Sequence, residues 1–251
     1  MNNPKRFLSE TVTIFFRIVI GLIILVFLGI SYFAYPSGDD YNLAYLSSER
    51  GLWKSQETWY RRWTGRYTWN FMGSLLSQPC ISSPCWYSLA PLIFLSGLGA
   101  ALYFLSIRLF PCFPIPFARM GWISVFLVLY LTHLPDPGSL YWFTSLIKYQ
   151  LASILFIILA ALMIGKGGDI SASPPGRISA AVAALTSFLA VGCCETTMTL
   201  LVFFLCVGAA VTWIRGNDSR WRWLIVLLAA LGGGAMLCFA PGNSIRFAVI
   251  P

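Results

Sequence analysis

The sequence has little charge, since only 10% of its 251 residues are Asp, Glu, Lys or Arg, against about 25% in ordinary soluble domains. It contains a single histidine, and no phosphate-binding loop, zinc-ligand spacing or glycine-rich dinucleotide motif is found in it. Hydrophobic residues make up 58% of the chain, more than one soluble core can bury. This composition excludes a water-soluble enzyme, a disordered tail and a secreted disulfide-rich miniprotein. It predicts a protein of the lipid bilayer.

Long apolar runs indicate the architecture, because a helix needs about 20 apolar residues to cross the hydrocarbon layer. The first run is too long for a signal peptide and lacks a small-residue cleavage site. We expect an all-α membrane protein, with residues 1–251 forming a single polytopic domain. About seven transmembrane helices are predicted, at Thr13–Ala34, Trp86–Ile107, Met120–Leu134, Phe143–Gly165, Ile178–Cys193, Thr197–Ile214 and Trp223–Phe239.

The basic residues predict the orientation, because Lys and Arg favour short cytoplasmic loops. With the N-terminus in the cytoplasm, the short outer loops carry only Lys148 and Arg246. The other outer bases lie in the long first outer loop, residues 36–84, where the rule weakens. The formal net charge of +8 is therefore mostly an orientation signal, and we expect no nucleic-acid partner.

The long loop contains an aromatic and basic stretch, Glu57–Trp69. Helical spacing would place Arg62 on one face with Arg66 and Trp69. One interpretation is an amphipathic helix in the headgroup layer. The other is a clamp in which Arg62 or Arg66 binds a lipid phosphate, because the planar guanidinium matches phosphate oxygens. Both can hold together.

Cysteines provide no metal-ligand spacing, and most of them lie in or beside predicted spans, where small residues pack. Cys80 and Cys85 differ, because both fall in the outer loop, where a disulfide can persist. The sequence leaves open whether they are bonded.

Most acidic residues fall on the outer side. Asp39 and Asp40 directly follow the first span, where they would either cap the next helix or deprotonate an acceptor hydroxyl. Glu195 interrupts an apolar stretch between two spans, where an ionisable group is costly and usually faces a cavity; the alternative is a solvated turn. The outer acids are Asp39, Asp40, Glu49, Glu57, Asp136 and Glu195.

Two further groups face the same side. Ala240-Pro241-Gly242-Asn243 precedes Arg246 and is either a simple turn or a turn that directs Asn243, backbone N–H groups and Arg246 at an anion. Lys148 lies one or two turns inside the fourth span, where it would snorkel outward or pair with an acid in a cavity.

This ordered set of motifs resembles a group of bacterial multi-pass membrane proteins related to C-type, lipid-sugar-dependent glycosyltransferases (GT-C). The resemblance rests on Gly38-Asp39-Asp40-Tyr41 after a first span, Gly65-Arg66-Tyr67, Glu195 between spans, and Ala240-Pro241-Gly242-Asn243 with Arg246. It implies a GT-C-like fold in the bacterial cytoplasmic membrane. Because members of that superfamily typically have more spans, the chain is expected to be the N-terminal part of a larger GT-C-type unit.

The resemblance also implies an activity, which is inverting transfer of a sugar from a polyprenyl-phosphate donor to an envelope glycan or lipid. Its catalytic acids would be Asp39, Asp40 and Glu195, with Asp39 as the first choice of base. The phosphate would be bound by Arg62, Arg66, Lys148, Asn243 and Arg246. No spacing demands a metal ion, although paired acids can bind one. The alternative function is a non-catalytic transporter or lipid-carrier-binding subunit, and a remnant without activity is a third.

Overall fold

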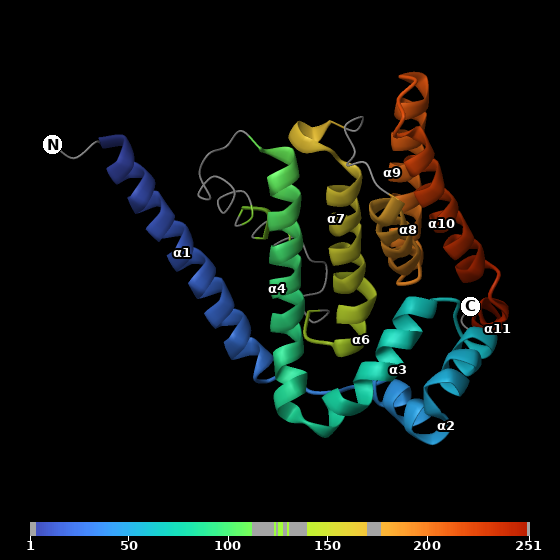
Figure 1. Cartoon of the computed structure of the whole chain (residues 1–251). Helices are drawn as coiled ribbons and strands as arrows, with labels where there is room; N and C mark the ends of the chain where they lie inside the picture. Colours follow the sequence, from blue (N-terminus) through green and yellow to red (C-terminus); the bar gives the residue numbers. More distant parts are fainter. Residues whose placement is uncertain are drawn as a thin grey trace.

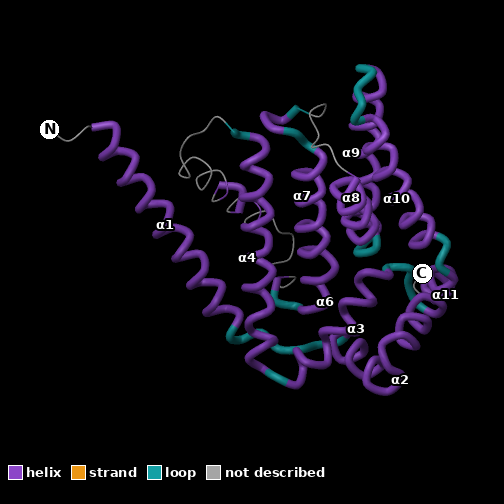
Figure 2. The backbone as a smooth tube through the Cα atoms, viewed as in Figure 1, coloured by secondary structure: helices purple, strands orange, loops and turns teal. Residues whose placement is uncertain are grey.

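The computed structural model describes residues 4–111, 123, 125–127, 130, 140–169 and 177–249. These residues form ten α-helices and no strand (Figures 1 and 2), which confirms the all-α prediction for the described part of the chain. A π-helical turn, η2 (Leu146–Gln150), joins α6 to α7, and a 3-10 turn, η3 (Lys166–Gly168), follows α7. The helices are α1 (Pro4–Ser31), α2 (Asp39–Arg62), α3 (Tyr67–Ser82), α4 (Pro84–Leu109), α6 (Phe143–Ser145), α7 (Leu151–Met163), α8 (Arg177–Val191), α9 (Glu195–Ile214), α10 (Arg220–Cys238) and α11 (Pro241–Val249).

Four helical stretches are long and apolar enough to cross a membrane: α4, the continuous run Phe143–Met163, α9 and α10. Each coincides within a few residues with a predicted span, and the expected break between residues 178 and 214 falls at residues 192–194. The apolar helix Ile178–Val191 is shorter, and the apolar stretch Arg17–Ser31 lies within α1. The predicted span Met120–Leu134 lies mostly outside the described residues, as does Asp136.

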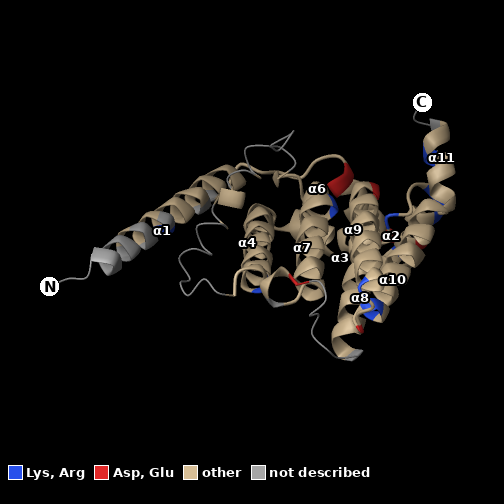
Figure 3. Ribbon diagram, turned by 90° about the horizontal axis from the view of Figure 1, so that it is seen from above, with Lys and Arg blue, Asp and Glu red and all other residues tan. Residues whose placement is uncertain are grey.

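The helices place the polar segments at one end of the bundle. In Figure 1, α2, α3 and α11 gather beside the start of α4, α6 and the turn between α8 and α9. We call this the α2–α3 end. The N-terminus, η3 and the connection from α9 to α10 lie at the opposite end. Viewed from above, the ribbons are mostly tan, with few blue or red segments that mark charged residues (Figure 3). The segments that the sequence assigns to one side of a membrane therefore lie together.

The long loop contains two helices, which corrects the prediction of one helical face through residues 57–69. The chain leaves α2 at Trp63 and starts α3 at Tyr67, so Arg62 ends one helix and Arg66 directly precedes the next. The reason is packing: a Cβ added to Gly65 would collide with the carbonyl oxygen of Leu237. The linker Trp63–Arg66 is therefore held against the end of α10.

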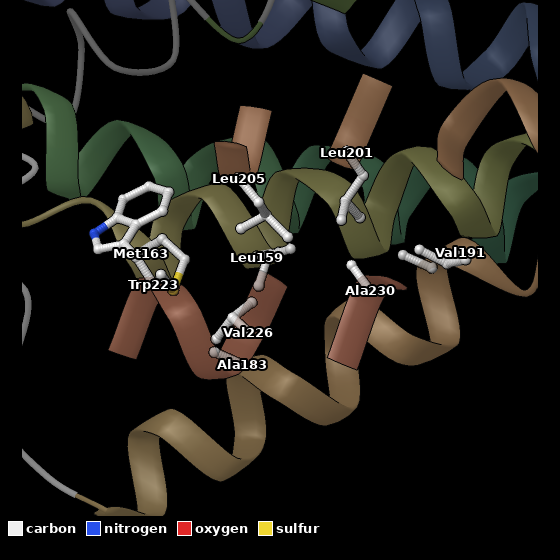
Figure 4. Packing of buried hydrophobic residues seen from close by; sticks show 10 residues of the cluster. Leu159, Met163, Ala183, Val191, Leu201, Leu205, Trp223, Val226 and Ala230 are labelled. Atoms are coloured by element: carbon white, nitrogen blue, oxygen red, sulfur yellow. The ribbon is translucent and has the colours of Figure 1, made fainter. Parts of the chain in front are cut away.

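One hydrophobic core joins α7, α8, α9 and α10 (Figure 4). Trp223 of α10 is fully buried and lies against Gly208 of α9, where a Cβ would overlap the indole ring. Close packing of this kind is sensitive to added volume. The remaining fully buried members of the cluster include Leu159, Met163, Val191, Leu201, Leu205 and Val226.

A second core anchors the helices of the α2–α3 end to the apolar bundle. Leu43 of α2 is fully buried, and its Cδ1 atom would lie 2.7 Å from a Cβ placed on Gly73 of α3. Trp69 of α3, Tyr87 of α4 and Ile147 of η2 belong to the same cluster. The position of α2 and α3 is therefore determined by packing against the apolar bundle.

Candidate functional site

Two arginines and one glutamate from distant parts of the chain meet at the α2–α3 end. The Nε–H of Arg66 lies 3.1 and 2.9 Å from the two carboxylate oxygens of Glu195. Arg246 Nη2 lies 3.4 Å from Glu195 Oε1. The side chains of Arg66 and Arg246 are 16% and 14% exposed, and that of Glu195 is 39% exposed. We call these three residues the arginine–glutamate cluster.

The start of α3 brings Arg66 into this cluster. The first N–H groups of a helix lack partners within it, and those of Thr68 and Trp69 donate to the carbonyl of Gly192, at 3.1 and 3.3 Å. Tyr67 donates its hydroxyl proton to the carbonyl of Phe188. A Cβ on Gly192 would collide with Tyr67 and Thr68. These contacts dock α3 onto the α8–α9 turn, three residues before Glu195.

Asn243 holds the linker, the end of α10 and the start of α11 together. Its Nδ2 group donates to the carbonyls of Leu237 and Cys238, at 2.7 and 3.2 Å, and its Oδ1 accepts from the N–H of Gly65 at 3.3 Å. The side chain is 9% exposed. The amide that the sequence offered for phosphate binding is therefore used inside the protein, where it satisfies the final carbonyls of α10.

The cluster retains unused hydrogen-bond donors. Arg66 uses its Nε–H on Glu195, and its Nη groups donate to no described residue. Arg246 reaches Thr64 Oγ1 only at 3.4 Å. Two guanidinium groups against one carboxylate leave a net charge of +1. Partial burial strengthens electrostatic attraction by reducing solvent screening, so the arrangement is suited to an anion with several oxygens.

Asp40 occupies a different environment. Its side chain is fully buried and accepts hydrogen bonds from the Tyr87 hydroxyl at 2.7 Å and from the N–H of Thr144 at 3.0 Å. The N–H of Ser37 donates to it at 3.2 Å. Burial raises the pKa of the Asp40 carboxyl above its usual value, although these hydrogen bonds oppose the rise. Asp40 therefore ties the start of α2 to α4 and α6.

Asp39 and Arg62, at the first and last residues of α2, are both exposed. Neither forms a side-chain hydrogen bond or ion pair within the described part of the chain. Lys148 lies half-buried in η2, a rare helical form that is common at functional sites, with its ammonium group 4.7 Å from the centre of the Tyr149 ring. It has no acidic partner among the described residues.

The structure thus brings together Arg66, Glu195 and Arg246, and attaches Asn243 to them through Gly65. Asp39 and Asp40 lie apart from this cluster. Leu43 packs at Gly73, which is seven residues and about 10 Å along α3 from Arg66. No described contact joins Asp39, Arg62 or Lys148 to the cluster.

Sequence reasoning missed the partners that create both environments. Tyr87 and Thr144 surround Asp40, and no local pattern marks them, because their role depends on tertiary contact. No local pattern marks Gly65 and Gly192 either, because the collisions that exclude a side chain at these positions arise from tertiary packing. Capping, one of the two roles that the sequence left open for Asp40, is not observed, because no side-chain cap hydrogen bond forms at the start of α2.

The cysteines and the other residue types that can bind metals form no further candidate site among the described residues. Cys80 is half-buried, Cys85 is exposed, and both have free thiols; burial raises the pKa of Cys80 to about 11. Within the described ranges, no group of three or more His, Cys, Asp or Glu side chains could hold a metal ion. Comparison with known protein families, curated proteins and solved structures finds no match to the chain.

Proposed function

We propose that this chain is a membrane protein that binds a polyprenyl-phosphate-linked sugar at the arginine–glutamate cluster and transfers the sugar to an acceptor hydroxyl. The observation that carries the proposal is the convergence of Arg66 and Arg246 on Glu195. A single carboxylate orients both guanidinium groups and cannot neutralise them. The four long apolar helices provide the lipid surroundings that such a donor requires.

The arginines would act on the leaving group. When the bond between the anomeric carbon and the phosphate oxygen breaks, negative charge grows on the phosphate. The unused Nη donors of Arg66, together with Arg246, would stabilise that charge by hydrogen bonds aimed at it in a partly water-excluded site. A carboxylate between two guanidinium groups is a poor base, so Glu195 would not deprotonate the acceptor. Its role would be to position the two arginines, which both contact it.

Asp39 is the best candidate for the base, because it is exposed while the Asp40 carboxylate is buried and hydrogen-bonded. Its carboxylate would accept the proton of the acceptor hydroxyl, and the hydroxyl oxygen would attack the anomeric carbon as the phosphate leaves from the opposite face. The configuration at that carbon would be inverted. The sugar and acceptor would have to bridge the space between Asp39 and the cluster, which no described contact closes.

Lipid binding provides the first test, with decaprenyl phosphate and the uncharged alcohol decaprenol as probes of the full chain in nanodiscs. Each of Arg66→Gln and Arg246→Gln should weaken phosphate binding about 10- to 100-fold, because each loses a charge-assisted hydrogen bond, and should leave decaprenol binding unchanged. Arg61→Gln is the matched control, because Arg61 is 70% exposed and paired with Glu57. Equal affinity of the unaltered chain for both lipids would refute the proposal.

A second function, lipid-carrier binding without transfer, is favoured by one observation: no described contact joins Asp39 to the cluster. The two functions differ in the Asp39→Asn variant. Under the transferase proposal, this variant binds decaprenyl phosphate normally and no longer glycosylates the envelope. Under the second, binding and envelope composition are both unaffected by Asp39→Asn.

A further inference from the structure

A separate groove lies between α2 and α3, on the part of the α2–α3 end that begins at Asp39. It has a volume of about 500 Å³. Its main lining residues are Tyr41, Asn42, Tyr45 and Ser48 from α2, with Gln78 and Ser82 from α3. None of its lining residues is charged, which distinguishes it from the arginine–glutamate cluster.

The helical repeat explains how α2 forms one wall. Tyr41, Tyr45 and Ser48 recur at intervals of four and three residues, so they lie on one face of the helix. Leu43 points elsewhere, into the packing contact with Gly73 that holds α2 against α3. Packing therefore fixes the distance between the two walls while the polar and aromatic side chains remain outside the core.

The aromatic side chains of the groove are strongly exposed. Tyr41 is 51% exposed and Tyr45 is 62% exposed, although a large aromatic side chain loses much of its favourable burial energy in water. The Tyr45 hydroxyl donates to the carboxylate of Glu49, one turn further along α2, which restrains the Tyr45 side chain. Two exposed rings beside a groove provide flat apolar surfaces for a ligand.

Two side-chain amides provide polar groups for a ligand in the groove. The side-chain amides of Asn42 and Gln78 are exposed and form no hydrogen bond with other described residues. Each amide offers both donors and acceptors. The hydroxyls of Ser48 and Ser82 donate to backbone carbonyls, at 2.8 Å from Tyr45 O and 2.8 Å from Gln78 O, so their oxygens can still accept.

This combination matches the chemistry of a neutral carbohydrate. A sugar ring presents C–H groups on its faces, which pack on the electron-rich face of an aromatic ring, and hydroxyls on its edge, which pair with amides and other hydroxyls. The groove offers no fixed charge for a phosphate or a carboxylate. We propose that it binds a neutral oligosaccharide.

The groove also lies beside the proposed base. Asp39 and Asn42 are three residues apart and therefore neighbours on α2, so a sugar hydroxyl bound at the Asn42 end lies near the Asp39 carboxylate. The groove is thus the acceptor site of the transferase, a role that rests on the function proposed above. Binding of the oligosaccharide itself does not require the donor.

Direct binding tests the inference, with mannohexaose, cellohexaose and chitohexaose as probes of the full chain in nanodiscs. At least one of them should bind, and each of Tyr41→Ala and Tyr45→Ala should weaken that binding about tenfold or more by removing a stacking surface. Gln78→Ala should weaken it several-fold. The matched control is Tyr35→Ala, because Tyr35 is 77% exposed and does not line the groove.

Two controls make the outcome decisive. The thermal unfolding midpoint of each variant shows whether it has folded, and Arg66→Gln should retain full oligosaccharide affinity while losing decaprenyl phosphate. The inference is overturned if none of the three probes binds, or if folded Tyr41→Ala and Tyr45→Ala variants bind as well as the unaltered chain. Loss of phosphate selectivity with retained oligosaccharide binding would refute only the donor proposal.

Discussion

Asp40 and Glu195 are both acids at the α2–α3 end, yet the fold gives them opposite environments. Asp40 is fully buried among neutral partners, a tyrosine hydroxyl and two backbone N–H groups. Glu195 is 39% exposed and lies between two arginines. The first environment penalises a negative charge, while the second requires one. The comparison shows that one acid serves the architecture and the other organises a site that attracts anions.

The largest expected effect is the loss of the Asp40 carboxyl group. Asp40→Ala leaves the Tyr87 hydroxyl and the N–H groups of Thr144 and Ser37 without their acceptor. The Tyr87 and Thr144 donors are buried, and unsatisfied buried donors cost about 1–3 kcal/mol each, so the free energy of unfolding should fall by about 2 kcal/mol or more. Chemical denaturation in detergent micelles measures it.

Asp39→Ala is the matched control for that experiment, because the neighbouring acid is exposed and its removal should change stability by less than about 0.5 kcal/mol. Equal effects of the two substitutions would show that the Asp40 network does not stabilise the fold.

The next effect concerns the linker that presents Arg66 to Glu195. Gly65→Ala places a methyl group against Leu237 O and 2.7 Å from Ala240 Cβ. Because backbone atoms cannot move aside cheaply, overpacking should cost about 1–3 kcal/mol and displace Arg66, so decaprenyl phosphate binding should weaken. Gly232→Ala is the control, since a Cβ there meets nothing within 4 Å. Unaltered stability and binding in Gly65→Ala would contradict the close packing of the linker.

A smaller effect is expected from Glu195→Gln. This change removes the charge between Arg66 and Arg246, but the carboxylate is more than one-third exposed, so solvent screening limits the loss of stability to about 1 kcal/mol. The freed arginines should bind inorganic phosphate more strongly at low ionic strength and less so at high salt. Isothermal titration at two salt concentrations measures this difference. The glutamine carbonyl can still accept hydrogen bonds from Arg66 and Arg246 and keep them in position, so an unchanged or lower phosphate affinity at low salt would contradict the prediction that the charge of Glu195 opposes anion binding.

Much of the helix placement was predictable, because a long apolar run has the length and composition of a membrane-crossing helix. The predicted spans that coincide with α4, Phe143–Met163, α9 and α10 are of this kind, and so is the break before Glu195. The division between Glu195 and Asp40 was not predictable. It depends on Tyr87 and Thr144, which lie far along the chain from Asp40, and on the contact of Gly192 with the start of α3; these roles arise only from packing. Helical spacing also failed to predict the break between α2 and α3 at Gly65, because this break depends on packing against Leu237.

The smallest effect, and the most specific test of the comparison, is the pH dependence contributed by Asp40. Burial raises the pKa of the folded-state carboxyl above 3.8, its ordinary value. The folded chain therefore holds the Asp40 proton more tightly than the unfolded chain does. This contribution to stability is fully present below about pH 4 and is lost as the pH rises through the folded-state pKa. Asp40→Asn has no such proton, and the other titrating groups are common to both proteins. The unfolding midpoint of the unaltered chain minus that of Asp40→Asn should therefore decrease as the pH rises from 4 to 7. This decrease should be smaller than the loss of stability expected for Asp40→Ala. A difference that stays constant over this range would mean that Asp40 is ionised equally in both states, and the contrast with Glu195 would then rest on geometry alone.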